Sequence, residues 1–246
     1  PAKRPKMIHS ACILTILTTG EPTMLGIIGG TSLLFTRLPD LETRVVYTPF
    51  GNSEVLCGEY ALLMRHQRNK PPHRINFRSH LAALALCGVT HLVSIGSAGT
   101  LKQEIPEGSV VIPSDYMSMA PIPSFHDHAI RHVLPEFSPG LSRQLAALIP
   151  EARHGGIYVQ TPGPRLETRA EVRALAAGAD LVGMTVASEA TLARELGMEI
   201  AALCTVDNYA HGIADESPTY EHLLKRSEEC KDRTGDMVKR IIAGLA

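Results

Sequence analysis

Residues 180–208, DLVGMTVASEATLARELGMEIAALCTVDN, decide the fold class of this chain. The apolar run Asp180–Gly183 predicts a short strand that ends at Met184-Thr185. A helix is expected next, capped by Ser188 and closed by Gly197 after Leu196. The long apolar run Met198–Val206 predicts a second strand, which ends at Asp207-Asn208. A strand, a helix and a strand in this order predict a parallel βαβ unit and therefore an α/β fold.

The same pattern extends outward from this stretch in both directions. Further strands are predicted at Met24–Ile28, Ala61–Met64, His91–Ile95 and Val110–Pro113, and helices at Arg78–Cys87, Ala170–Ala177 and Pro218–Leu245. We expect a single domain in which a central mixed, largely parallel twisted sheet is flanked by helices.

Polar and glycine-rich segments follow the predicted strands. They are Gly29-Gly30-Thr31-Ser32, Arg65-His66, Gly96-Ser97-Ala98-Gly99-Thr100, Met184-Thr185 and Asn208. Ligands of parallel α/β sheets bind beyond the carboxyl ends of the strands, so these segments form the candidate site. They offer free backbone N–H groups, hydroxyls, a guanidinium and an amide. Such groups suit an oxyanion and a polar heterocycle better than a metal ion.

Length and composition fit one globular domain. The chain has 246 residues, of which 44% are hydrophobic and 20% charged, which is ordinary for a soluble protein. We divide it into an N-terminal extension, residues 1–23, and a domain, residues 24–246. Lys3, Arg4 and Lys6 precede a short apolar stretch that faintly resembles a signal peptide. The stretch is polar-interrupted, so a cytoplasmic location is expected.

Charge and cysteine content exclude several classes of function. The 24 basic residues against 25 acidic ones leave no positive excess for a nucleic-acid backbone. No apolar run has the length of a membrane span. The five scattered cysteines have no metal-ligand spacing, so neither a metal site nor a disulfide framework is expected. Nucleic-acid and membrane partners are therefore not expected.

Each motif alone has an ordinary structural reading beside the functional one. Gly29-Gly30-Thr31 can cradle a phosphate group or can simply form a tight corner. Arg65-His66 can clamp an anion, or Arg65 can be a solvated charge. The segment 163–168 can be a turn with Thr168 as a helix N-cap, and Asn208 can be a turn residue. Their joint occurrence at successive strand ends favours the functional reading.

Taken together, the motifs resemble the trimeric purine nucleoside phosphorylase and methylthioadenosine phosphorylase family. The resemblance runs from about Met24 to the C-terminal helix and is nearest to the 6-oxopurine, methylthioinosine phosphorylase-like members. The matching segments are Gly26–Thr31, Thr48–Gly51, Arg65-His66, Asn76–Arg78, Gly163–Glu167, Gly183–Thr185 and Asn208.

The resemblance implies the nucleoside phosphorylase fold and a pentosyltransferase that acts in purine salvage. It implies no metal and no organic cofactor, with inorganic phosphate as the co-substrate, and a homotrimer. The implied phosphate-binding residues are Thr31, Arg65, His66, Gly96, Ser97 and Thr185. The implied catalytic residues are Asn208 and Glu167. The implied substrate-binding residues are Leu166, Glu167, Met184, Asn208, Tyr209, Ala210 and Tyr220.

Base preference is where the sequence departs from part of this family. Members that act on 6-aminopurines resemble this chain but carry Asp at the Asn208 position and an acid at the Ala210 position. An amide can donate to O6 or N7 of a 6-oxopurine, and Glu167 can accept from N1–H. These residues therefore favour phosphorolysis of inosine, guanosine or S-methyl-5′-thioinosine to free base and (5-methylthio)ribose 1-phosphate.

Several alternatives stay open. Tyr220 offers both a ring and a hydroxyl, so it does not decide between a 5′-hydroxyl and a 5′-methylthio group. The segment Phe125-His126 resembles the stretch that closes a neighbouring subunit's 5′ pocket. An S-methyl-5′-thioadenosine phosphorylase would need Asp207 to enter the base pocket. A nucleosidase that uses water, and a nucleoside-binding protein without turnover, are the other two alternatives. The loop 67–74 after His66 is shorter than is usual in the family.

Overall fold

The computed structural model describes residues 23–33, 41–215 and 219–246 of the chain. The expected N-terminal extension, residues 1–23, lies outside this part except for its last residue. Within it, no helix is long and apolar enough to cross a bilayer.

Eleven strands form one mixed sheet in the described part of the chain. The main order is β2-β3-β4-β1-β5-β10-β9-β7, while β11 pairs with β5 and β6, and β6 pairs with β8. The strands are β1 (Leu25–Gly29), β2 (Glu42–Thr48), β3 (Gly51–Cys57), β4 (Ala61–Met64), β5 (His91–Thr100), β6 (Val110–Ile112), β7 (Asp115–Ser118), β8 (Arg153–His154), β9 (Ile157–Gln160), β10 (Leu181–Gly183) and β11 (Glu199–Tyr209).

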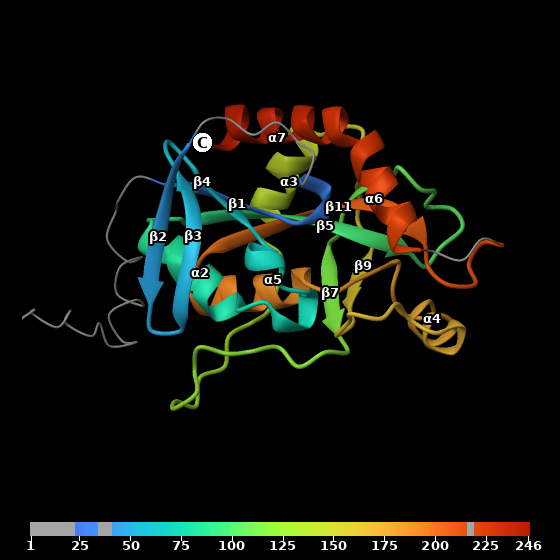
Figure 1. Cartoon of the computed structure of the whole chain (residues 1–246), viewed down its shortest axis with the longest axis horizontal. Coiled ribbons are helices and arrows are strands. Elements are labelled where there is room, and N and C mark those ends of the chain that lie inside the picture. The colour runs from blue at the N-terminus through green and yellow to red at the C-terminus, as the bar shows by residue number, and fades with distance from the viewer. Residues whose placement is uncertain (1–22, 34–40, 216–218) are drawn as a thin grey trace, which may run out of the picture.

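Helices cover both faces of this sheet (Figure 1). They are α2 (Phe77–Leu86), α3 (Pro139–Leu148), α4 (Arg169–Leu175), α5 (Val186–Glu195), α6 (Tyr220–Glu229) and α7 (Lys231–Leu245), with the short 3₁₀ turns η2 (Thr31–Leu33), η3 (Gln67–Asn69) and η4 (Pro72–Arg74). One buried apolar cluster joins the sheet to α2 and α5, and a second joins its other face to α3 and α7. The expected α/β domain is confirmed.

The centre of the sheet is parallel, because β4, β1, β5 and β11 all run in one direction. Most residues of these strands are buried, as expected for central parallel strands, and polar side chains gather toward the carboxyl ends of β5 and β11. The hairpin β2–β3 joins this centre through antiparallel pairing of β3 with β4. The carboxyl ends of the four parallel strands therefore meet at one edge of the sheet.

The predicted parallel βαβ unit at residues 180–208 is wrong in its strand pairing. The strand–α5–strand order is as predicted, but β10 pairs antiparallel with the end of β5, whereas β11 lies parallel to β5. Because β5 extends past the end of β1, its last residues are free to bind β10. Hydrophobic periodicity predicts that a strand exists, but it does not specify its neighbours.

Three local predictions need correction. The segment Gly96–Thr100 is the second half of β5, because β11 continues beside it and supplies the hydrogen bonds of a strand. Thr185 is the N-cap of α5, so Ser188 lies inside the first turn. The C-terminal helix is broken at Cys230 into α6 and α7. Thr168 is the N-cap of α4, as expected, and forms a capping box with Glu171.

Candidate active site

The register of the central strands brings the predicted phosphate residues to one place. Gly29 lies opposite both Met64 of β4 and Ile95 of β5, so the residues that follow these three positions are neighbours. The backbone N–H of Arg65 donates to the Gly29 carbonyl at 2.7 Å, which fixes the two strand ends together. The structure thus gathers Thr31, Arg65, His66, Gly96 and Ser97 at the sheet edge.

Gly30 leaves room beside the two basic side chains. A Cβ at this position would lie 2.5 Å from Arg65 Nη1 and 3.5 Å from His66 Nε2. The space beside Gly30 therefore faces a guanidinium nitrogen and an imidazole nitrogen. The turn η2, which begins with the hydroxyl residue Thr31, follows Gly30 directly in the sequence. A small oxyanion bound here would have the Arg65 guanidinium as a side-chain donor, together with backbone N–H groups.

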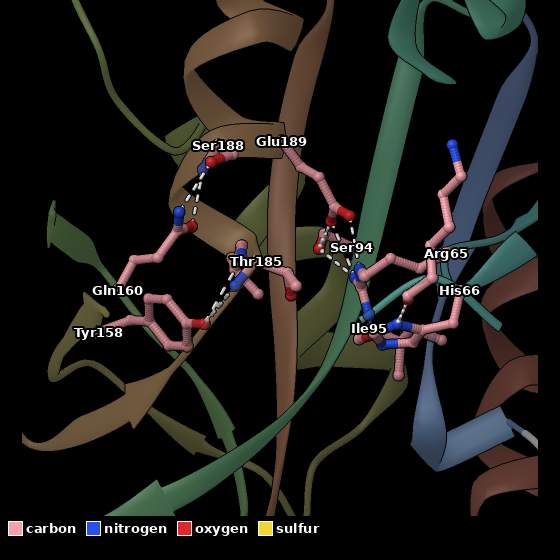
Figure 2. Close-up of polar contacts among 11 residues, drawn as sticks. Arg65, His66, Ser94, Ile95, Tyr158, Gln160, Thr185, Ser188 and Glu189 are labelled. Atoms are coloured by element: carbon pink, nitrogen blue, oxygen red, sulfur yellow. Dashed lines mark hydrogen bonds and ion pairs between the residues drawn. The ribbon is translucent and has the colours of Figure 1, made fainter. Parts of the chain in front are cut away.

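Arg65 is held by a buried carboxylate rather than by solvent. Its Nε and Nη2 donate to Glu189 Oε1 and Oε2 at 2.6 and 2.8 Å, and both side chains are at most 2% exposed. Its Nη1 donates to the Ile95 carbonyl at 3.1 Å, and Ser94 Oγ donates to Glu189 Oε2 at 2.5 Å. Figure 2 shows Glu189 reaching from α5 to Arg65 beside Ser94.

This arrangement corrects the prediction of Arg65 as a bidentate anion clamp. The two parallel N–H groups of the guanidinium are used by Glu189, so one hydrogen on Nη1 remains for a ligand. Burial acts to lower the pKa of Arg65, but the charge and hydrogen bonds of Glu189 outweigh it and keep the pKa raised. The guanidinium is therefore a fixed cation whose position is set before any ligand arrives.

His66 has its ring orientation set by the backbone. Its Nδ1 lies 2.9 Å from the Lys70 carbonyl, which can only accept, so Nδ1 carries the proton. Burial lowers the pKa of His66, and the nearby Arg65 charge acts in the same direction. At neutral pH the ring is uncharged and Nε2 presents a lone pair toward Gly30. Such a nitrogen accepts from a protonated phosphate oxygen, or gains a proton when a dianion binds.

Thr185 begins α5 at the opposite side of this region. The Tyr158 hydroxyl lies 3.3 and 3.4 Å from the backbone nitrogens of Thr185 and Val186 and accepts from both. Gln160 holds Ser188 through its side-chain amide, accepting from the Ser188 backbone and donating to its hydroxyl (Figure 2). Backbone N–H groups at the start of α5 therefore find hydrogen-bond acceptors on buried side chains of β9, and these bonds fix the position of the helix start.

Ser97 differs from expectation in what its hydroxyl does. It donates a hydrogen bond to Asp207 Oδ2, so its proton is already engaged. Burial raises the pKa of Asp207 to about 6, although the hydrogen bonds from Ser97 and Thr205 act to lower it. The Ser97 hydroxyl can therefore only accept a hydrogen bond from a ligand, because its own hydrogen is bound to Asp207. The backbone N–H of Ser97 takes no part in the bond to Asp207.

Asn208, which is predicted to bind the base, lies on the strand next to β5. Asn208 of β11 pairs with Gly99 of β5, and Gly99 pairs with Val182 of β10. The Asn208 Nδ2 atom is 3.1 Å from where a Gly99 Cβ would be and donates to the Tyr209 carbonyl at 2.8 Å. One of its two amide hydrogens remains for a ligand. A side chain at position 99 would press against this amide, so the glycine leaves the Asn208 side chain its space.

Glu167 comes from the loop after β9. Its carboxylate is 7% exposed and accepts from Thr161 Oγ1 at 2.5 Å. Thr161 is in turn bound to the Gly183 carbonyl through its backbone N–H at 2.8 Å, next to the strand that pairs with Gly99. Glu167 therefore follows the strand on one side of β10, whereas Asn208 lies on β11, on the other side of β5.

The remaining residues predicted for the base and ribose come from the loop after β9, the end of β10, the end of β11 and the start of α6. Met184 follows β10 and is half-buried, with its Sδ 2.5 Å from the position of a Gly163 Cβ. Leu166 and Tyr209 are also half-buried, whereas Ala210 is 2% exposed within a small apolar cluster. Tyr220 is the first residue of α6, and the predicted role of its side chain stays a prediction. Phe125 packs edge-on against Phe50 of its own chain, with ring centroids 5.1 Å apart.

A hollow of about 270 Å³ opens next to Arg65 on the side of β3 and α2. Its lining includes Asn52, Arg68, Lys70 and His80. Of these, Arg68 and Lys70 bring positive charge to the approach to Arg65. Among the residues that the structure describes, no group of three His, Cys, Asp or Glu side chains is placed to hold a metal ion.

Sequence reasoning did not assign the residues that hold the site in place. Glu189, Ser94, Tyr158 and Gln160 are all at most 2% exposed. One signal for Glu189 exists in the sequence, because it is a carboxylate among Val186, Ala187 and Ala190 in a helix whose neighbours are apolar. A buried acid in that setting requires a cationic partner.

A family model described as the phosphorylase superfamily matches residues 24–243, and the chain belongs to this superfamily. The chain is 38% identical over 235 residues to the probable 6-oxopurine nucleoside phosphorylase of Archaeoglobus fulgidus, which covers 89% of this chain and 97% of that protein. It is 33% identical to the probable S-methyl-5′-thioinosine phosphorylase of Methanocaldococcus jannaschii, with coverage of 89% and 92%. The resemblance inferred from the motifs is confirmed.

The fold is shared with solved structures as well. Methylthioadenosine phosphorylase from Schistosoma mansoni in complex with adenine superposes with a TM-score of 0.82 over 90% of this chain and 91% of that one. The two sequences are 23% identical, so this similarity shows the common fold.

Proposed function

We propose that this chain is a purine nucleoside phosphorylase that transfers a pentosyl group from a 6-oxopurine nucleoside to inorganic phosphate. The observation that carries the proposal is the burial of Asn208 and Glu167, each 7% exposed, with Ala210 where an acid would serve a 6-aminopurine. Asn208 lies on β11, which with β10 flanks the end of β5, and Glu167 lies in the loop after β9. The similarity to proteins named 6-oxopurine nucleoside phosphorylase and S-methyl-5′-thioinosine phosphorylase supports it.

The reaction breaks the C1′–N9 bond and forms a bond between C1′ and a phosphate oxygen. Positive charge develops on the ribose and negative charge on the departing base. The phosphate, held by Thr31, Arg65, His66, Gly96 and Ser97 with Thr185 opposite, stabilises the first charge and is the nucleophile. The amide of Asn208 donates at N7 or O6 and stabilises the second.

Base preference follows from which groups donate. Asn208 Nδ2 retains one hydrogen for the base, and that hydrogen suits the oxygen of a 6-oxopurine. Glu167 has one oxygen bound to Thr161, so its second oxygen can accept from N1–H. A 6-aminopurine has no N1–H and would leave this carboxylate without a donor, which costs binding free energy. Met184 lies under the ribose in this arrangement, and Leu166, Tyr209 and Ala210 border the base.

The alternative of an S-methyl-5′-thioadenosine phosphorylase requires Asp207 to enter the base pocket. Its hydrogen bond to Ser97 and its exposed fraction of 4% argue against that movement. A nucleosidase would use water and has no use for the buried cation of Arg65 at this edge of the sheet. A binding protein without turnover has the same groups, so activity alone separates it from the phosphorylase.

The 5′ group is either a hydroxyl or a methylthio group, and we rank the two equally. We further propose that the enzyme works in purine salvage in the cytoplasm, as a homotrimer, with residues 24–246 as the catalytic domain and residues 1–23 as an extension. Inorganic phosphate is the co-substrate, and no metal or organic cofactor takes part. A solution mass of one chain would contradict the trimer.

Base release decides between these functions. The purified protein is incubated with inosine, guanosine, S-methyl-5′-thioinosine, adenosine and S-methyl-5′-thioadenosine, with and without phosphate. We expect phosphate-dependent release of hypoxanthine and guanine with the adenine nucleosides much slower. Release without phosphate indicates a nucleosidase, rapid adenine release indicates the methylthioadenosine alternative, and no release indicates a binding protein.

Asn208→Asp tests the base contact directly. A carboxylate at this position repels O6 and accepts from a 6-amino group, so the ratio of kcat/KM for inosine to that for adenosine should fall by about tenfold or more. Asn69→Asp, an exposed amide of η3, is the matched control and should leave the ratio unchanged. An unchanged ratio in Asn208→Asp would place the base elsewhere.

A further inference from the structure

Asp207 occupies an irregular position in the strand that carries Asn208. From Glu199 to Val206, β11 pairs residue for residue with β5, and Val206 lies opposite Ala98. Asn208 then lies opposite Gly99, so Asp207 is an extra residue in a β-bulge. A bulge re-aims the side chains that follow it, and here it sets the direction of Asn208.

The side chain of Asp207 anchors this bulge. It is 4% exposed, and its Oδ2 accepts the hydroxyl hydrogen of Ser97, one strand away on β5. A second anchor is the backbone N–H of Tyr209, which donates to Glu107 Oε1 at 3.2 Å. The two chain neighbours of Asn208 are thus both held by carboxylate contacts, Asp207 through its own side chain and Tyr209 through Glu107.

The surroundings of Asp207 contain no full ionic partner among the described residues. Ser97 and Thr205 offer hydroxyls from β5 and β11, Glu107 adds a negative charge from the loop after β5, and Arg226 faces it from α6. Arg226 is itself bound to Glu229 at 2.8 Å. Burial disfavours the charged carboxylate, and it raises the pKa of Asp207 to about 6 although Ser97, Thr205 and Arg226 act to lower it.

We propose that Asp207 is a positioning residue that holds the β11 bulge against Ser97 and so aims the Asn208 amide at the purine base. This inference rests on the proposed function for the identity of the ligand, but the positioning itself is a property of the free protein. Ser97 is proposed to bind phosphate and Asn208 to bind the base, so the buried carboxylate of Asp207 connects the two parts of the proposed site.

The ionised carboxylate is the form that accepts the Ser97 hydroxyl. As the pH falls through about 6, Asp207 gains a proton and this charge-assisted hydrogen bond weakens. The aim of Asn208 and the turnover of nucleoside should therefore decline together in this range. His66 also titrates below its ordinary value, so a comparison of variants is needed to separate the two groups.

Three variants and one control test the proposal. Asp207→Ala removes the anchor, Asp207→Asn keeps its shape and an acceptor oxygen without the ionisation, and Ser97→Ala removes the partner. Asp115→Asn changes an exposed carboxylate at the start of β7 and is the control. The first readout is the NMR signal of the Asn208 side-chain amide in the ligand-free protein between pH 5 and 8. The second is the pH profile of kcat and KM with inosine and phosphate.

We expect the Asn208 signal of the unaltered protein to shift with an apparent midpoint near pH 6, a step absent from Asp207→Asn and present in Asp115→Asn. At pH 8, Asp207→Ala should lose about tenfold in kcat with a smaller change in KM, and Asp207→Asn should recover part of the loss. An Asn208 signal that is identical in Asp207→Ala and the unaltered protein would overturn the proposal.

The amide signal keeps this test independent of the proposed function. If no nucleoside is cleaved but the Asn208 step disappears in Asp207→Asn, the positioning stands and the proposed function fails. If Asp207→Ala does not fold, Ser97→Ala tests the same contact from the other side, since loss of the hydroxyl must displace the Asn208 signal. An unmoved signal in Ser97→Ala overturns the proposal.

Discussion

The buried pair of Arg65 and Glu189 gives the sharpest prediction of this structure. Glu189→Gln keeps the shape of the side chain but removes the charge that neutralises a guanidinium exposed by only 2%. Removal of one partner from a buried ion pair costs about 3–5 kcal/mol, because the other charge stays buried without compensation. Arg65 keeps neutral acceptors at the Ile95 carbonyl and Ser94 hydroxyl, so we expect the lower end, about 3 kcal/mol.

The chain contains a matched pair on its surface. Arg165 and Glu171 make the same two-pronged contact, with both distances 2.7 Å, but their side chains are 66% and 43% exposed. An exposed ion pair is worth about 0.2–1 kcal/mol. Glu171→Gln also retains the capping box of α4, since Gln serves at that position. The same substitution should therefore cost several times less free energy of unfolding at the surface.

The assay is urea unfolding followed by circular dichroism, without phosphate and at one fixed protein concentration. The concentration is fixed because assembly alters the apparent stability. In thermal scans, about 3 kcal/mol corresponds to a fall of about 6–12 °C in Tm for a chain of this size. The double variant Arg65→Met/Glu189→Leu removes both charges and should be destabilised by less than the sum of its single variants.

Equal losses in Glu189→Gln and Glu171→Gln, within about 0.5 kcal/mol, would refute the reasoning. Such a result would mean that Arg65 reaches water in solution and that its charge is not held by Glu189. The proposed role of Arg65 as a fixed cation for phosphate would then fail as well.

Three further predictions concern the support of the site. Tyr158→Phe leaves the Thr185 and Val186 N–H groups without an acceptor and should cost about 1–3 kcal/mol in urea unfolding; no loss would show that water replaces the hydroxyl. Gly183→Ala drives a methyl group into that same hydroxyl and should destabilise by about 1–3 kcal/mol, whereas Gly140→Ala, with open space around it, should not. Burial lowers the pKa of His80 from 6.5 to about 4, so its contribution to stability is complete above pH 6.5 and is lost as the pH falls toward 4. The unfolding free energy should drop by on the order of 3 kcal/mol over that range. His80→Gln should reduce this drop and the exposed His73→Gln should not; equal pH profiles in the two variants would contradict the assignment.

Local pattern is enough to predict most of the elements. The apolar runs at β1, β4 and β11 and the helical spacing of α2 and α4 appear within a few residues of their predicted bounds. Thr168 is an N-cap as predicted, because a cap depends on the side chain and on the N–H groups two or three residues later. Interactions this short in sequence are visible without knowledge of the fold.

Strand pairing and the orientation of buried polar groups are not predictable in this way. Gly96–Thr100 looks like a loop because of its glycines, yet it is a strand because β11 lies beside it. The sequence predicts that the Arg65 guanidinium is available to bind an anion, yet its Nε and Nη2 groups are bound to Glu189, which is 124 residues away in the chain. The Ser97–Asp207 contact spans 110 residues. No window of sequence contains both partners of such contacts.

The sequence by itself determined the α/β class, the order of the elements and the set of strand-end residues, because periodicity and strand-end composition are local properties. It also pointed to the family, since several ordered motifs occur together. Only the tertiary structure decided which of those side chains remain available to a ligand. A buried polar group must find a partner, and that partner is supplied by whichever strand or helix the fold places next to it. In this protein, Arg65 Nε and Nη2 bind Glu189, and the Ser97 hydroxyl binds Asp207. One hydrogen of Arg65 Nη1, the His66 Nε2 nitrogen and one hydrogen of the Asn208 amide remain for a ligand.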